Sequence, residues 1–517
     1  MSAASHSFLG LSAANRALVA IAVALGTFMQ VLDTTVANVA IPSIAGNLGV
    51  SNEQGTWVIT CFAIASAISV PLTGWLMARF GLIRTFMVSI GLFTLASFLC
   101  GMAWDLSSLV FFRVFQGLVA GPMVPGSQAV LLAIFPAEKR GKALAIWSVT
   151  TLIAPVVGPV LGGWISDNWS WPWIFFINVP AGLFSVFVCG RIMRGRESAT
   201  RKLPVDHVGL GLIIIWVGSL QLMLDKGKDA DWFASPFIVA LAVIAAVGFV
   251  AFLIWELNEE HPIVDLSLFQ QRDFWVGTVV NAVGYGVFFG NLILMSLWLQ
   301  TQMGYNATSS GLVAVPAGLI GMFLAPVVAK LLARVDARWI ATFAMVFFGW
   351  SFYARSQLTT AADFSQVAFA VGLQGFSLAT FFIASVTIML NRLPPERVPA
   401  ASGMAGFLRL TAGGIAASVV TTIWDHRAAL YQSRLVDRTS VFDAPFTYAM
   451  QGLQSLGLSS DQSAAVLTRT VAQEAYAKSA FEIAAVSAVI MLALIGVIWV
   501  GHSTKGAARS PQVVAAD

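Results

Sequence analysis

The chain has 517 residues, of which 58% are hydrophobic and only 10% are charged, with a formal net charge of +4. Soluble domains carry about 25% charged residues, so this composition excludes a water-soluble globular protein. Apolar runs of about 20 residues recur from end to end, which predicts an all-α polytopic membrane protein and not a barrel of short alternating strands. The small basic excess gives no indication of a nucleic-acid partner.

Breaks at proline, glycine and charged residues divide the chain into fourteen predicted membrane spans. In chain order they cover residues 17–41, 55–77, 84–103, 107–133, 143–165, 172–193, 208–224, 237–256, 275–300, 309–332, 338–356, 363–390, 401–424 and 482–501. The connections on one side hold nineteen of the 29 lysines and arginines, whereas the short connections on the other side hold only Lys226, Lys228 and Arg355. Because short cytoplasmic loops are rich in these residues, we expect both termini to be cytoplasmic.

Three short motifs recur in the same order at offsets of 255, 258 and 258 residues. The pairs are LMAR at 76–79 with LLAR at 331–334, FPAEK at 135–139 with LPPER at 393–397, and QG at 116–117 with QG at 374–375. Two six-span halves around two inserted spans (6+2+6) are therefore predicted, an organisation typical of secondary transporters. The expected layout is a cytoplasmic tail 1–16, a bundle 17–195, an insert with its linkers 196–272, a second bundle 273–501 that includes a periplasmic loop 425–481, and a cytoplasmic tail 502–517.

Five stretches of the first half carry polar or glycine residues inside apolar runs. They are LDTTVANVAIP at 32–42, GWLMARFGLIR at 74–84, RVFQG at 113–117, APVVGPVLGG at 154–163 and WPWIFFINVPAG at 171–182. Together they resemble the motifs of the major facilitator superfamily, in particular its 14-span drug:proton antiporter branch of the EmrB/QacA type. Three positions depart from the family pattern: Ala78 replaces an acid, Ala154 replaces a glycine and Pro172 replaces an arginine.

The resemblance implies the major facilitator fold with 14 transmembrane helices and the proton-driven export of hydrophobic or amphipathic drugs across a bacterial inner membrane, and so antibiotic resistance. It implies the proton-motive force in place of a cofactor, and a periplasmic adaptor (membrane fusion) protein and a TolC-type outer-membrane channel as partners. A dedicated exporter of one metabolite, such as a fatty acid or a siderophore, is the alternative. A membrane-embedded enzyme or a passive channel is disfavoured, because we find no metal or titratable cluster and neither needs the duplication.

Asp33 lies inside the first span, nine residues before Pro42 and therefore about 13 Å below the outer surface. A carboxylate in lipid costs about 2.5–3.5 kcal/mol, so a chain that retains one usually uses it. Arg113 enters with the fourth span from the outside and reaches a similar depth, and the resemblance places both spans beside a central cavity. We expect Asp33 to be the proton-coupling carboxylate and Arg113 to tune its protonation; a static ion pair between two helices is the alternative.

Other candidates follow from the same motifs. The expected substrate-cavity residues are Gln30, Thr34, Asn38, Gln116, Asn291 and Gln374, although interhelical hydrogen bonding explains Gln30 and Thr34 equally well. The expected conformational residues are Gly74, Arg79, Gly81, Arg84, Gly158, Pro159, Gly162 and Gly163, with positive-inside charge or close helix packing as the alternatives.

Two further segments attract attention. Arg409 is a deep charge in span 13 without an identified partner, and the second half has Asn291 and Val371 where the first has Asp33 and Arg113. The long external connection ends in DQSAAVLTRTVAQEAYAKSA, which is rich in helix formers. We expect either part of the adaptor-docking surface or a solvated loop there.

Overall fold

The computed structural model describes residues 10–136, 139–202, 204–332, 334–436 and 444–504. Within these ranges the chain forms helices and no strand, which confirms the predicted all-α class. The first half contains α2 (Ala13–Leu48), α3 (Asn52–Gly55), α4 (Trp57–Ser69), α5 (Thr73–Phe80), α6 (Leu82–Gly101), α7 (Leu106–Ala120), α8 (Met123–Ile134), α9 (Arg140–Asn168), α10 (Trp173–Phe176) and α11 (Asn178–Ile192).

The insert and the second half follow. The insert contains α12 (His207–Lys226), η2 (Trp232–Ala234), α13 (Pro236–Asn258) and η3 (Leu266–Gln270). The second half contains α14 (Arg272–Thr301), α15 (Ala307–Leu312), α16 (Val315–Leu331), α17 (Ala337–Ser356), α18 (Phe364–Gly372), α19 (Gly375–Met389), η4 (Pro395–Arg397), α20 (Val398–Val436), α21 (Ala444–Ser455) and α22 (Ser460–Ile498).

The fourteen predicted spans all lie mainly on helical residues, but not every helix is both long and apolar enough to cross a membrane. Eleven helices in the described ranges meet both conditions, and the pair α4–α5, bent by 58° at its break, makes twelve. The other two predicted spans lie on α9 and α17, whose 29 and 20 residues suffice in length for about 30 Å of hydrocarbon. The count of fourteen therefore stays a prediction.

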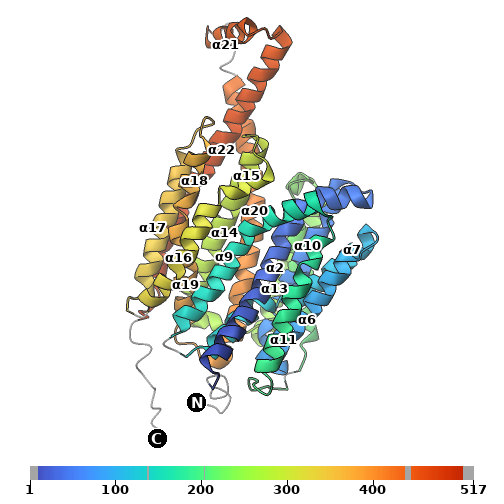
Figure 1. Ribbon diagram of the computed structural model, residues 1–517, viewed down its shortest axis with the longest axis vertical. Helices are drawn as coiled ribbons and strands as arrows, with labels where there is room; N and C mark the ends of the chain where they lie inside the picture. Colours follow the sequence, from blue (N-terminus) through green and yellow to red (C-terminus); the bar gives the residue numbers. More distant parts are fainter. Residues whose placement is uncertain (1–9, 137–138, 203, 333, 437–443, 505–517) are drawn as a thin grey trace.

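The two halves form bundles that lie side by side (Figure 1). In the first bundle α2 packs against α9 and α11, and in the second α14 packs against α20 while α17 packs against α22. Helix α9 also runs along α16 and α19 of the second bundle, so it is shared between the halves. This arrangement agrees with the duplication that the repeated motifs predict.

Helices α20 and α22 extend beyond the bundles. Each has 39 residues, or about 58 Å, roughly twice the thickness of bilayer hydrocarbon. Figure 1 shows α22 rising from the bundle to α21, and we call residues 425–436 and 444–480 the helical extension. The sequence predicts a loop over 425–481 that is helical only near its end, whereas the described part of this segment is mostly helical.

The halves touch at the end of the bundles opposite the helical extension. A Cβ atom on Gly74 would lie 2.7 Å from Cα of Ala400, and one on Gly141 would lie 2.9 Å from the carbonyl oxygen of Ala329. Such approaches are possible only for glycine, because real Cβ atoms do not come so close to backbone atoms. The two halves are therefore in close backbone contact at these two points.

The insert connects the two halves on the side of α4 and α20. Thr60 on α4 donates a hydrogen bond of 2.7 Å to Asp225 of α12. From the other half, Ser418 on α20 donates to the carbonyl oxygen of Leu224 at 2.8 Å. Helix α12 of the insert thus contacts both bundles, which the predicted 6+2+6 order does not specify.

Candidate functional site

Asp33 lies in the middle of α2 with its side chain 1% exposed. Its Oδ2 accepts a hydrogen bond of 2.5 Å from Nη1 of Arg113 on α7, which also makes the pair an ion pair. Its Oδ1 accepts from Nδ2 of Asn178 at 2.9 Å and from Nε2 of Gln116 at 3.2 Å. The structure therefore brings together the two residues that we expect to couple protons, and adds two amides around the same carboxylate.

Arg113 is fully buried and is held from several sides. Its Nε donates to the carbonyl oxygen of Val58 at 2.9 Å, and its Nη1 also donates to Oε1 of Gln116 at 2.8 Å. The guanidinium lies 4.2 Å from the ring centre of Phe62 and 5.5 Å from that of Phe175, within the range of cation–π attraction. Its Nη2 makes no hydrogen bond to any described residue, so the cation is not fully satisfied.

Asn178 is the member of this site that the sequence reasoning misses. It begins α11 directly after the break at Ile177, and it also donates to Oγ of Ser97 on α6 at 3.0 Å. Ser97 in turn donates to the carbonyl oxygen of Phe175, also at 3.0 Å. A signal was available, because Asn178 is the one amide inside the apolar stretch WPWIFFINVPAG. The site therefore draws on α2, α4, α6, α7, α10 and α11.

The ion pair between Asp33 and Arg113 links α2 to α7 in the interior of the first bundle. Breaking a buried ion pair by removing one partner typically costs about 3–5 kcal/mol, enough to bias a conformational equilibrium by more than a hundredfold. Within the described residues, no group of three or more His, Cys, Asp or Glu side chains could hold a metal ion.

The expected substrate-cavity residues are dispersed. Gln116 belongs to the Asp33 site, Gln30 is buried with its Oε1 unpaired among the described residues, and Asn38 is exposed. Thr34 donates to the carbonyl oxygen of Val31 on its own helix at 2.7 Å. The last two candidates lie in the second half and are described next.

Gln374 accepts a hydrogen bond from Arg355, and Arg355 is only 3% exposed. The sequence reasoning assigns Arg355 to an external connection, and the structure corrects this, because Arg355 is part of α17 and points into the protein. Asn291 donates to Oγ of Ser487 at 2.8 Å and lines, with Arg355, a small cavity inside the second bundle. The second half therefore has a buried Arg–Gln pair of its own, without a carboxylate.

The glycines of the span 5 motif allow α9 to pack closely on α2. A Cβ atom on Gly158 would lie 1.9 Å from Oγ1 of Thr35, and one on Gly162 would lie 3.0 Å from the carbonyl oxygen of Val36. The side chain of Pro159 lies outside the described part, and Gly163 follows on the same helix. Close packing of α9 on the helix that carries Asp33 is thus observed.

The loop between α5 and α6 obtains its carboxylate from elsewhere in the chain. Ala78 stands where the family usually has an acid, but Glu197, from the linker before α12, accepts hydrogen bonds from the backbone N–H groups of Ile83 at 2.8 Å and Arg84 at 2.9 Å. Gly81 has a φ of 97°, and a Cβ atom there would lie 2.3 Å from Cδ of Glu197. Arg79 lies over the ring of Trp75 at 5.2 Å. Glycine at position 81 is therefore required both by its backbone and by the borrowed carboxylate.

The comparisons with known proteins agree with this architecture. The family model "Major Facilitator Superfamily" matches residues 23–418. The chain is 44% identical over 498 residues to "Multidrug export protein EmrB" of Escherichia coli (strain K12), covering 96% of this chain and 97% of that protein. It is 42% identical over 500 residues to "Fatty acid resistance protein FarB" of Neisseria gonorrhoeae, covering 96% and 99%.

A solved structure gives the same result for the fold. The proton:xylose symporter XylE superposes with a TM-score of 0.54 at 12% identity, covering 96% of this chain and 98% of that chain. The sequence match covers well over half of the chain, and the two bundles with their shared interface are those of a multi-pass transporter. The protein belongs to the Major Facilitator Superfamily.

Proposed function

We propose that this protein exports hydrophobic or amphipathic drug-like compounds across a bacterial inner membrane, in exchange for protons. The support is the 44% identity, over nearly the whole chain, to a relative whose name describes multidrug export. The observation that carries the proton coupling is the buried ion pair of Asp33 with Arg113, surrounded by the amides of Gln116 and Asn178.

The coupling step follows from the site. In the described state Asp33 is paired with Arg113, and this contact links α2 to α7. Protonation of Asp33 removes the ionic part of this contact and leaves the Arg113 cation without its counter-charge. The packing of α2 against α7 is weakened as a result. A proton that enters from one side of the membrane and leaves on the other can thus bias the exchange between two conformations, while a static pair would not respond.

The test is efflux from proteoliposomes under an imposed pH gradient, with wild type and Asp33→Asn compared. We expect the variant to bind drug but to lose its response to the gradient, because an amide cannot exchange the proton. Glu256→Gln on α13 is the matched control, since Glu256 is also a buried carboxylate in a membrane helix but contacts none of the Asp33 partners named above. If Asp33→Asn keeps gradient-driven efflux unchanged, the ion pair of Asp33 with Arg113 is a static contact between two helices and does not couple protons.

A dedicated exporter of one metabolite is the second candidate, favoured by the 42% identity to a relative named for fatty acid resistance. A competition panel separates the two functions. Broad cross-competition among unrelated amphipathic compounds supports the multidrug pump, whereas competition only within one chemical class, such as fatty acids or siderophores, supports the dedicated exporter.

The positive-inside distribution of the basic residues supports cytoplasmic termini, so that the helical extension faces the periplasm. We infer that this extension contacts a periplasmic adaptor (membrane fusion) protein, which in turn engages a TolC-type outer-membrane channel. It projects far beyond the bundles and carries exposed apolar side chains, with Tyr448 74% and Leu456 79% exposed. Exposed apolar groups beyond the membrane are typical of protein contacts.

The docking proposal is tested with Leu456→Asp and with deletion of residues 436–460. Both changes should abolish co-purification of the adaptor from the native host while leaving drug transport in vesicles intact. Ser455→Asp, next to Leu456, is the control for added charge. Adaptor capture that survives the deletion would place docking elsewhere.

A further inference from the structure

The second bundle contains a small cavity between α14, α17 and α22. Its polar lining is Asn291 and Trp298 from α14 and Arg355 from α17, and its other lining side chains are leucine, methionine, alanine and phenylalanine. The volume is about 20 Å³. Because about 10–15 Å³ suffices for one water molecule, this cavity holds a single guest of roughly that size.

Arg355 is a buried cation without a counter-charge among the described residues. It is 3% exposed and takes part in none of the ion pairs that these residues form. It donates to Oε1 of Gln374, and its guanidinium lies 5.2 Å from the ring centre of Phe352. Its Nε is shut off from solvent and has no hydrogen-bond partner in the described chain. One amide oxygen and one ring do not replace the acceptors that five N–H groups and a positive charge require.

The acidic side chains of α22 nearest this cavity in the sequence are committed to other partners. Oε1 of Glu474 accepts a hydrogen bond from the hydroxyl of Thr360. Glu482 forms an ion pair with Arg427 at 3.4 Å. No acid is found among the described residues that line the cavity, so its charge is that of Arg355.

A second unpaired donor lines the same cavity. Trp298 is 1% exposed, and its indole N–H makes no hydrogen bond to any described residue. The amide nitrogen of Asn291, by contrast, donates to the carbonyl oxygen of Val287 at 2.9 Å and to Oγ of Ser487 at 2.8 Å. A water molecule would bring two hydrogen atoms of its own and no charge, whereas a monatomic anion accepts from both unpaired donors and neutralises the guanidinium.

The first half indicates which charge the second half lacks. In each half a buried arginine donates to the corresponding glutamine, Arg113 in the first half and Arg355 in the second. The first half completes this arrangement with the carboxylate of Asp33. At the offset of 258 residues, Asp33 corresponds to Asn291, an amide that lines the cavity. An anion in the cavity would restore the charge that the exchange of carboxylate for amide removes.

We propose that this cavity binds a single chloride ion, with Arg355 and Trp298 as its donors. Chloride is an abundant anion close to a water molecule in size, whereas phosphate, sulfate and carboxylic acids are too large for about 20 Å³. Thr360, in the loop after α17, is bound to Glu474 of the helical extension, so the site lies near that end of the bundle. The ion is an exchangeable counter-charge that holds α14, α17 and α22 together, and it takes no part in the proton exchange proposed for Asp33.

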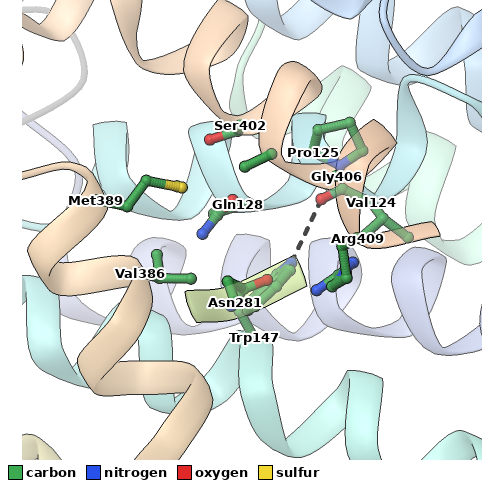
Figure 2. A pocket seen from close by; sticks show the side chains of 11 residues that line it. Val124, Pro125, Gln128, Trp147, Asn281, Val386, Met389, Ser402, Gly406 and Arg409 are labelled. Carbon is green, nitrogen blue, oxygen red and sulfur yellow. Dashed lines mark hydrogen bonds between the residues drawn. The ribbon is translucent and has the colours of Figure 1, made fainter. Parts of the chain in front are cut away.

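Arg409 provides a matched contrast, because it also lies deep in a helix of the second half and forms no ion pair with a described residue. Figure 2 shows it between the two halves, near Trp147 and Asn281. Its guanidinium lies 5.3 Å from the ring centre of Trp147 and 5.4 Å from that of Tyr285. The cavity there has a volume of only about 10 Å³, the lower limit for one water molecule, so we expect no chloride at Arg409.

Thermal unfolding of the purified protein in detergent tests the site, with sodium chloride and sodium gluconate compared at equal ionic strength. Chloride should raise the melting temperature by several degrees and with saturation, because the ion binds only the folded protein, and bromide should act in the same way. Arg355→Gln should abolish this shift. Trp298→Phe, which removes the N–H but keeps a ring, should weaken the apparent chloride affinity about tenfold or more. Arg409→Gln is the control and should keep the full shift.

Asn291→Asp is the complementary variant, since it places a fixed carboxylate where the first half has Asp33. We expect it to raise the melting temperature in gluconate and to remove the dependence on chloride. Four results would overturn the site: no saturable chloride effect in wild type, which would leave water as the guest; an effect that survives Arg355→Gln; an effect unchanged in Asn291→Asp; or an effect lost in Arg409→Gln, which would put the anion between the halves. If Arg355→Gln does not fold, Trp298→Phe and Asn291→Asp decide the question.

Discussion

The two halves of the molecule keep the same polar frame but differ in charge. At an offset of 258 residues, Asp33 corresponds to Asn291 and Gln116 corresponds to Gln374. The first half pairs its carboxylate with an arginine on α7, whereas in the second half Arg355 from α17 donates to Gln374 and no acidic side chain among the described residues lines the cavity beside this pair. At this offset the glutamine is common to both halves, whereas Arg113 corresponds to Val371 and Arg355 corresponds to Ser97, so the two buried arginines reach the paired glutamines from different helices.

We therefore expect the largest difference between the halves when Arg113 and Arg355 are each replaced and the free energy of unfolding is measured. Arg113→Gln leaves Asp33 buried without its cation, and we expect a loss of about 3–5 kcal/mol in the free energy of unfolding in detergent. Arg355→Gln leaves no unpaired carboxylate, so we expect about 1–2 kcal/mol or less. Restoring balance in the double variant Asp33→Asn/Arg113→Gln should recover part of the loss. Equal costs for the two arginines would mean that the Asp33–Arg113 ion pair contributes little.

A second contrast concerns the helix that carries the small residues. In the first half the glycines are on α9, where Gly158 faces Thr35 of α2. In the second half both helices of the corresponding pair carry such glycines: a Cβ atom on Gly286 of α14 would lie 2.9 Å from the carbonyl oxygen of Ala412 on α20, and one on Gly413 of α20 would lie 2.9 Å from the ring of Tyr285 on α14. Close packing of the two helices is thus common to both halves, and the second half distributes its glycines over both helices.

Gly158→Ala and Gly286→Ala should each destabilise the protein by about 1–3 kcal/mol, since the added methyl group overlaps the neighbouring helix. Thermal unfolding in detergent measures the effect. Gly211→Ala on α12 is the control, because a Cβ atom there meets nothing within 4 Å and alanine favours a helix by up to about 1 kcal/mol. If Gly158→Ala keeps its stability but loses transport, the motif acts in the conformational change and not in packing.

Depth along a helix was enough to predict the Asp33–Arg113 pair, because both residues lie on long apolar helices that enter from opposite directions. Asn178 was not predictable in this way, since its place depends on the break between α10 and α11. Arg355 was misassigned because it lies one residue from the end of α17, where a charge usually reaches water. The Glu197 contact joins residues more than a hundred positions apart, which no local pattern specifies.

The smallest contrast concerns the source of the carboxylate at the N-termini of α6 and α17. At the start of α6 the carboxylate is that of Glu197, which comes from the linker before α12. At the start of α17 the carboxylate is that of Asp336, which lies in the loop itself, caps α17 and accepts hydrogen bonds from Arg338, Ser503 and Thr504. Burial by itself raises the pKa of Asp336, but these hydrogen bonds outweigh it and hold the pKa well below its ordinary range. Asp336 therefore stabilises the fold above the pH at which a free aspartate titrates, about 3.9, and loses this effect as the pH falls below it.

Asp336→Asn and Glu197→Gln should each cost about 1–2 kcal/mol at neutral pH, because both changes weaken charge-assisted hydrogen bonds at a helix start. The difference in melting temperature between wild type and Asp336→Asn should stay constant from pH 7 to pH 4 and shrink only below about pH 3.9, where the unfolded-state carboxyl of Asp336 takes up a proton. Glu197 acts across the linker, so its loss should also loosen the insert and increase proteolysis between α11 and α12. Proteolysis that is unchanged in Glu197→Gln would mean that the linker is held by its backbone, through the bond from Arg201 N–H to the carbonyl oxygen of Ala78, and not by the borrowed acid.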